Sequence, residues 1–134
     1  MSEIVEKPID LIAVQNAMLK QEQIKLEPKH TFGDGLYIRE LFIPKGVMLV
    51  GKRHRHKTMN MLVKGKMTIY DENSSFEVEA PFMAESAEFT KKMGYAHEDS
   101  IWVNIHPTNE TDLDKIEEEF IIKEEEYLAL SEVV

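Results

Sequence analysis

The chain has 134 residues and a mass of 15.5 kDa, with 43% hydrophobic residues and a mean hydropathy of −0.35. This length predicts a single domain over residues 1–134, because the chain is too short for two hydrophobic cores. The lack of cysteine excludes disulfides and cysteine nucleophiles and favours a reducing compartment, so we expect a cytoplasmic protein. The first residues carry acids where a signal peptide carries bases, and no apolar run approaches the roughly 18 residues of a membrane span. Export and membrane insertion are therefore not expected.

The formal net charge is −9, and most of it lies at the C-terminal end. Residues 110–134 contain ten acids and two bases, whereas the rest of the chain is close to neutral. Binding to nucleic acid or to a membrane surface requires a broad basic field that neutralises phosphate. The sequence therefore predicts neither a nucleic-acid partner nor a membrane partner.

Residues 1–29 are expected to form a helical N-terminal arm. Apolar residues recur at helical spacing between positions 8 and 23, among them Ile9, Ile12 and Val14. Pro8 suits the first turn of a helix, where its missing N–H is not needed. The pattern predicts an amphipathic helix over 8–23.

Residues 30–108 form a series of short strand-like runs. These runs are rich in β-branched and aromatic residues and are separated by glycine, proline, aspartate and asparagine. They are LYIRELFI (36–43), VMLVG (47–51), TMNMLVKG (58–65), KMTIYD (66–71), SFEVEAPF (75–82), a stretch near 88–95, and SIWVNIH (100–106). Short antiparallel strands in this number predict an all-β sandwich or small barrel.

Residues 109–134 form an acidic tail that returns to helical spacing. Thr108, Asn109 and Thr111 offer N-caps, and the apolar residues at 113, 116 and 120 share one face. A second short helix is predicted from Lys123 to Leu130. The glutamate-rich runs of this tail are interpreted as solvated helix faces.

The strongest local feature is the pair His54 and His56, which precedes the run 58–63. In an extended segment side chains alternate in direction, so both imidazoles and Asn60 would share one face. Arg53 and Arg55 would then face solvent or another subunit. Two strand histidines at this spacing can chelate one divalent ion. Exposed surface histidines are the competing interpretation.

Gly46, Gly51, the histidine pair, the polar residue at 60 and Gly65 together resemble the first signature motif of the cupins. Cupins are small jelly-roll β-barrels in which two strand histidines and a glutamate bind a metal. Further motifs resemble an uncharacterised group of small cupin-like proteins from bacteriophages and some bacteria. These motifs are G-x-Y-x-R-E (35–40), F-x-P-x-G (42–46), G-Y-A-x-E-D-S-x-W (94–102) and H-P-T-x-E-x-D (106–112). The resemblance covers residues 30–122 and implies a cupin-type jelly-roll barrel with an N-terminal helix and a C-terminal helical tail.

The chain departs from the cupin pattern at two ligand positions. Asn60 stands where the first motif places its glutamate, and a neutral amide does not offset the charge of an ion. Lys92 stands near the place of the third histidine, in the second motif. The resemblance thus implies a weaker metal site. Its predicted ligands are His54, His56, Asn60 and His106, with His97 as the alternative to His106.

Four further residues are predicted to contact a ligand: Lys52, Arg39, Asn104 and Trp102. Lys52 shares the face of the histidine pair, whereas Arg39 and Glu40 are consecutive, so only one of them can face inward. A buried Arg39 needs a partner and can hold an anion. Asn104 and Trp102 share a strand face with His106, although a core or subunit contact is the competing interpretation for Trp102.

Two functions remain open at this point. One is a barrel pocket that binds a small polar or anionic molecule, with or without one divalent metal such as Fe, Mn, Ni or Zn. The other is a non-enzymatic sequestering or protein-interaction factor of phage type with a degenerate metal site. The residues name no reaction, so enzymatic activity is left undecided. An exposed sheet edge and an N-terminal arm available for exchange predict a homodimer.

Overall fold

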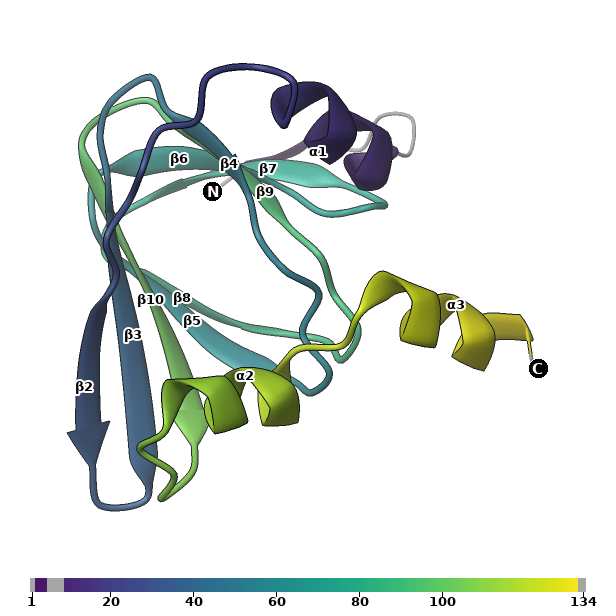
Figure 1. Ribbon diagram of the computed structural model, residues 1–134. Helices are drawn as coiled ribbons and strands as arrows, with labels where there is room; N and C mark the ends of the chain where they lie inside the picture. The colour runs from purple at the N-terminus through teal and green to yellow at the C-terminus, as the bar shows by residue number, and fades with distance from the viewer. Residues whose placement is uncertain (1, 5–8, 133–134) are drawn as a thin grey trace.

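The structure is a computed structural model that describes residues 2–4 and 9–132 (Figure 1). Its elements in chain order are β1 (Ser2–Ile4), α1 (Leu11–Met18), β2 (Lys29–Gly33), β3 (Leu36–Ile43), β4 (Met48–Val50), β5 (Thr58–Lys64), β6 (Lys66–Tyr70), β7 (Ser75–Glu79), β8 (Phe82–Ser86), β9 (Met93–Ala96), β10 (Ser100–Pro107), α2 (Leu113–Phe120) and α3 (Glu124–Glu132).

The strands form two antiparallel sheets, with orders β1-β7-β6-β9-β4 and β2-β3-β10-β5-β8. Strands far apart in the chain lie side by side: β10 pairs with both β3 and β5, and β9 pairs with both β4 and β6. The chain thus crosses repeatedly between the sheets, as in a jelly roll. Figure 1 shows the two sheets as separate layers, with α2 lying near one end of them. The predicted all-β jelly-roll architecture is confirmed.

The hydrophobic core lies between the two sheets and draws on both of them. Its buried members are Leu41, Ile43, Leu62, Met67, Ile69, Val78 and Ala96. Each such aliphatic side chain contributes about 1.5–3 kcal/mol when fully buried. Along β3 the inward side chains change from the apolar Leu41 and Ile43 to the polar Arg39. The interior therefore has an apolar part and a polar part.

The predicted strands agree with the observed ones over most of the barrel, but β2 and β8 were not predicted as separate strands. Four of the five β2 residues are exposed, so this edge strand shows no hydrophobic alternation. The start of β8 was joined to the preceding run 75–82, whereas the structure ends β7 at Glu79 and begins β8 at Phe82. A strand without one buried face carries no period-two signal.

The N-terminal arm contains a strand as well as a helix. β1 pairs with β7 at the edge of its sheet, and α1 is shorter than predicted. The carboxylate of Asp10 caps α1 by accepting a hydrogen bond from the Ala13 N–H over 3.0 Å. Pro8, predicted in the first turn, lies outside the described residues. Among the described helices, none combines the length and the apolar character needed to cross a bilayer.

The N-cap of α2 is Asp112, one residue after the last predicted cap, Thr111. Its Oδ1 accepts hydrogen bonds from the N–H groups of Asp114 and Lys115, at 2.9 and 3.3 Å. Asn109, predicted as a cap, instead accepts a hydrogen bond from the Gly35 N–H, at 2.8 Å. α2 is amphipathic and buries Ile116 and Phe120.

Candidate functional site

A cavity of about 440 Å³ lies inside the barrel, and α2 forms part of its wall. Its apolar part is lined by core side chains such as Leu41, Ile43 and Ile69. Its polar part is lined by side chains from the sheet that contains β3, β5 and β10, from loops and from α2. Most of the residues predicted to bind a ligand or a metal line this cavity. They are Arg39, Lys52, His54, Asn60, Trp102, Asn104 and His106.

Three of these residues form a row across neighbouring strands. The strand register places Asn104 on β10 opposite Arg39 on β3 and opposite Asn60 on β5. Asn104 Nδ2 donates to Asn60 Oδ1 over 2.6 Å, and Asn60 Nδ2 donates to Ser86 Oγ over 2.5 Å. Both asparagines are buried, so these hydrogen bonds hold their amide groups in one orientation.

His54 and His106 form the centre of the polar part. Their rings are stacked, with centroids 5.6 Å apart and planes inclined by 13°. Burial, followed by the charges of His106, Lys92 and Arg39, lowers the pKa of His54 to about 4. Burial, followed by the charge of Arg39, lowers the pKa of His106 to about 4. Both imidazoles are therefore neutral at pH 7, and each has one donor and one acceptor nitrogen.

The aromatic stack continues to the edge strand β2. Tyr37 stacks on His106 with centroids 5.9 Å apart, and His30 stacks on Tyr37 at 5.8 Å. The His30 Nδ1 lies 2.6 Å from the Tyr37 hydroxyl. His30 and Tyr37 both line the cavity, although neither was assigned to it from the sequence. Predicting β2 would have located His30, because this strand places it opposite Arg39.

His56 does not join His54 in the cavity. β5 begins at Thr58, and the chain bends at Arg55 and His56, so the alternation assumed for an extended segment does not hold there. His56 is exposed, and its ring lies edge-on to Phe120 at 6.0 Å. It does not belong to the cavity lining. The structure thus separates the two imidazoles that the motif placed together.

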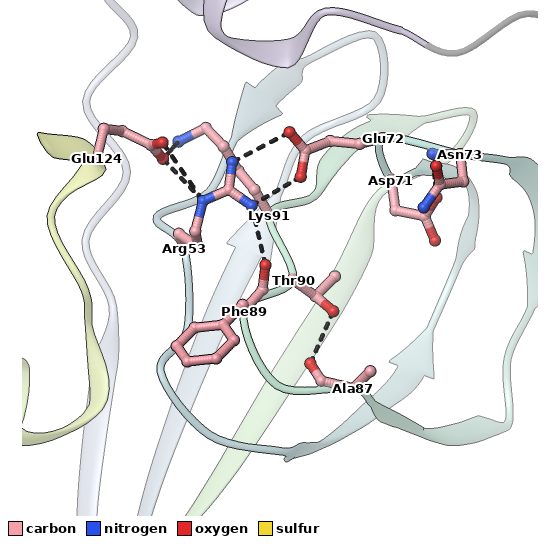
Figure 2. Close-up of polar contacts among 9 residues, drawn as sticks. All are labelled: Arg53, Asp71, Glu72, Asn73, Ala87, Phe89, Thr90, Lys91 and Glu124. Atoms are coloured by element: carbon pink, nitrogen blue, oxygen red, sulfur yellow. Dashed lines mark hydrogen bonds and ion pairs between the residues drawn. The ribbon is translucent and has the colours of Figure 1, made fainter. Parts of the chain in front are cut away.

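Arg53, predicted to face solvent or another subunit, is 2% exposed within the single chain, so that prediction is wrong. Figure 2 shows its guanidinium between Glu72 and Glu124. Nη1 and Nη2 donate to the two carboxylate oxygens of Glu72 at 2.7 and 3.1 Å, and Nε donates to Glu124 at 3.1 Å. Burial disfavours the charged form of the guanidinium. The hydrogen bonds to Glu72 and Glu124 outweigh this effect and raise the pKa of Arg53 above its usual range.

The same segment fastens the C-terminal tail beside the cavity. The Ile122 N–H donates to the Arg53 carbonyl over 3.0 Å, and the Arg55 N–H donates to the Phe120 carbonyl over 2.7 Å. The Arg53 guanidinium also lies 4.0 Å from the ring centroid of Tyr127 in α3. α2 is therefore held against the barrel by backbone bonds at its C-terminal end and by an ion-pair cluster beyond it.

Arg39 lines the cavity, whereas the adjacent Glu40 does not. Within the described part of the chain, no carboxylate oxygen lies within 4 Å of its guanidinium nitrogens. Lys52, by contrast, forms an exposed ion pair with Glu117 of α2. Arg39 is therefore a cavity cation that is not engaged by an acidic side chain of these residues.

Lys92 also lines the cavity, whereas His97 does not. The Lys92 Nζ contacts Ser86 Oγ. Burial lowers the pKa of Lys92 to about 8, although the charge of Asp71 opposes this effect. His97 Nε2 lies 2.6 Å from Thr68 Oγ1. Of the two alternatives to the missing third histidine, only His106 therefore lies at the cavity.

These residues do not fit a resident divalent metal. The cavity brings together the imidazoles of His54 and His106, and no group of three or more His, Cys, Asp and Glu suited to a metal ion occurs within 2–4 and 9–132. The Asn60 amide oxygen already accepts a hydrogen bond from Asn104. Arg39 and Lys92 act electrostatically on His54, and such positive charges repel a cation. The donor set is better suited to an anion.

No family model matches the chain, and no curated protein matches it. Solved structures do resemble it. KdgF from Halomonas sp. has a TM-score of 0.56 and 13% identity, over 82% of this chain and 99% of that one. Ectoine synthase from P. lautus has a TM-score of 0.58 and 13% identity, over 76% and 78% of the two chains. A cupin-2 domain protein from Shewanella frigidimarina NCIMB 400 has a TM-score of 0.51 and 10% identity, over 70% and 91%.

At these identities the comparisons show the fold alone. The resemblance to a bacteriophage and bacterial subgroup stays a prediction. The chain has the cupin-type jelly-roll fold.

Proposed function

We propose that the protein binds a small organic carboxylate in the barrel cavity, with Arg39 as its main electrostatic partner. The position of Arg39 carries this proposal: it lines the cavity, and no carboxylate oxygen of the described residues lies within 4 Å of it. A guanidinium presents N–H donors in a planar fork that matches the two oxygens of a carboxylate. A bound carboxylate would supply the partner that this cation lacks.

The surroundings of Arg39 support an organic anion rather than a simple inorganic ion. Neutral His54 and His106 offer hydrogen-bond donors and acceptors beside it. Leu41, Ile69 and Trp102 line the same cavity and offer apolar contact surface. A site with a few polar groups and an apolar wall is typical of small-molecule binding. The ligand that fits combines a carboxylate head with a short apolar body.

Catalysis at this site would use the two neutral imidazoles. With a pKa near 4, each is a proton acceptor over the whole neutral range, although a weak one. Ectoine synthase, one of the proteins with a similar fold, is an enzyme by its name. A binding protein that sequesters the carboxylate uses the same contacts without a proton transfer.

A homodimer is the proposed assembly. Phe42, Val63 and Met83 are 47%, 44% and 61% exposed, and they lie on β3, β5 and β8 of one sheet. An exposed apolar patch of this kind can be covered by the same patch of a second copy. Light scattering should give the mass of two chains for the wild type and of one chain for Met83→Lys. A wild-type mass of one chain at micromolar concentration would contradict the dimer.

The carboxylate proposal is tested by calorimetric titration with hexanoate and with hexanamide. We expect hexanoate to bind and hexanamide, which has the same apolar body without the charge, to bind much more weakly. Arg39→Met should weaken hexanoate binding at least about tenfold, because a charge-assisted hydrogen bond to a buried partner contributes about 1.5–3 kcal/mol. Arg55→Met is the matched control, because Arg55 pairs with Glu126 outside the cavity lining. Equal binding of the acid and the amide would contradict the proposal.

Elemental analysis of protein purified without a histidine tag tests the metal alternative. Our proposal predicts no stoichiometric Fe, Mn, Ni or Zn. If the protein holds stoichiometric metal that is lost in the His54→Ala/His106→Ala double variant, the cavity is a metal site and the carboxylate proposal is wrong.

A further inference from the structure

Two adjacent lysines before β9 have different environments. Lys91 is 3% exposed, and its Nζ lies 3.8 Å from Glu124, within the ion-pair cluster of Arg53 (Figure 2). Lys92 lines the barrel cavity instead. The sequence KK therefore supplies one lysine to the attachment of the tail and one to the cavity.

Lys92 has no acidic partner in the part of the chain that the structure describes: no carboxylate oxygen there lies within 4 Å of its Nζ. Its Nζ contacts Ser86 Oγ, a hydroxyl that already accepts a hydrogen bond from Asn60 Nδ2. The Lys92 Nζ donates to the same oxygen, whose two lone pairs can accept both hydrogen bonds. Burial favours the uncharged amine of Lys92 and lowers its pKa, although the charge of Asp71 opposes this effect.

Lys92 and Arg39 both act electrostatically on His54, although they belong to different parts of the barrel. Arg39 belongs to β3 of one sheet, and Lys92 directly precedes β9 of the other. Both charges act on His54, so both groups lie within electrostatic range of that ring. One small molecule in the cavity can therefore present a carboxylate to Arg39 and a second functional group to Lys92.

We propose that Lys92 is a nucleophilic amine that captures the carbonyl group of a small oxo acid as an imine in this cavity. The proposal rests on the carboxylate site argued above and names its ligand class. The amine nitrogen attacks the carbonyl carbon, and the carbonyl oxygen takes up a proton to give a carbinolamine. Loss of that oxygen as water leaves the C=N bond, so the overall change is carbonyl plus amine to imine plus water, without any oxidant or reductant. The neutral imidazole of His54 is the nearby group that can relay the proton.

Reductive trapping with pyruvate tests this step. The protein is incubated with pyruvate and cyanoborohydride, and the intact mass and the modified peptide are determined. We expect one reduced adduct per chain, located at Lys92 and absent from Lys92→Met. Lys64→Met is the matched control, because Lys64 is exposed and does not line the cavity, so this variant should keep the adduct. Adducts spread over surface lysines, or an equal yield in Lys92→Met, would overturn the proposal.

The pH dependence of trapping gives a second readout. The trapping rate at Lys92 should rise to half its maximum near pH 8, below the value of about 10.4 that applies to a lysine in a model peptide. A rate that follows the surface lysines would contradict a special role for this amine.

Calorimetry with propionate separates failure of this inference from failure of the carboxylate site. Propionate has the carboxylate but no carbonyl group. If propionate binds and pyruvate is not trapped, the imine proposal fails and the carboxylate site stands. If acetone, which has no carboxylate, is trapped at Lys92 as fast as pyruvate, the amine is reactive but Arg39 does not direct the ligand.

Discussion

His54 and His106 lie ring against ring in the cavity, with nearly parallel planes and centroids 5.6 Å apart, although one belongs to the segment before β5 and the other to β10. Protonation of either ring would place a charge in a buried site beside the other ring and near Arg39. The fold is therefore expected to tolerate these imidazoles in the neutral form only.

This pair makes stability depend on pH. Both histidines have a pKa of about 4 in the folded protein against 6.5 in the unfolded chain, so the unfolded chain binds more protons between these values. The free energy of unfolding should fall as the pH drops from 6.5 towards 4, by up to about 1.4 kcal/mol per pH unit for each imidazole. Urea unfolding at a series of pH values measures this slope.

The His54→Gln/His106→Gln double variant should lose most of that slope. His56→Gln is the control, because His56 is exposed and outside the cavity, and it should keep the wild-type slope. An unchanged slope in the double variant would show that other groups cause the acid sensitivity.

Removal of Arg53 from its ion-pair cluster should lower the free energy of unfolding strongly. Arg53→Met leaves Glu72, Glu124 and the Phe89 carbonyl without their shared donor. Both glutamates are about one-third exposed, so water compensates in part, and we expect a loss of about 2–3 kcal/mol.

Arg55→Met is the control for Arg53→Met, because the pair of Arg55 with Glu126 is more exposed and should contribute less than about 1 kcal/mol. Chemical unfolding followed by far-UV circular dichroism compares the two variants. Equal losses would mean that the cluster around Arg53 does not fasten the tail to the barrel.

A substitution in the turn between β5 and β6 should also lower the free energy of unfolding strongly. Gly65 has a φ of +96°, and a Cβ at this position would lie 2.5 Å from the Asp99 carbonyl oxygen and 2.7 Å from the Ser100 Cα. Gly65→Ala therefore combines backbone strain with a clash against backbone, and we expect a loss of about 3 kcal/mol or more.

Gly46 separates these two contributions. Its φ is +86°, but an added Cβ would meet nothing within 4 Å. Gly46→Ala should thus lose only the strain of about 1–2 kcal/mol. Thermal unfolding of both variants measures the difference, and a larger loss for Gly46→Ala would contradict the assigned clash at Gly65.

The barrel could be predicted from the sequence because most of its strands bury one face. The run 36–43 was predicted with the bounds that β3 has, and alternation correctly placed Trp102, Asn104 and His106 on one face of β10. The edge strand β2 was missed because it lacks a buried face. Period-two reasoning thus fails on β2 because exposure removes the pattern.

The candidate site could be predicted only in part, because its geometry depends on tertiary contacts. Alternation placed His56 beside His54, but the bend before β5 directs the two rings apart. Arg53 looked like a surface residue because its partners Glu72 and Glu124 are distant in sequence. The resemblance to cupins drew attention to position 92, whereas the burial of Lys92 and its contact with Ser86 could only come from the structure.

The most direct measurement of anion binding is the side-chain NMR signal of Arg39. The chain contains three arginines, Arg39, Arg53 and Arg55, so their Nε–Hε signals can be assigned from single substitutions. Titration with hexanoate should shift the Arg39 signal to saturation and leave that of Arg53 in place, because Arg53 is already held by Glu72 and Glu124. An Arg39 signal that does not move while hexanoate binds elsewhere, or does not bind at all, would contradict a carboxylate site in the barrel.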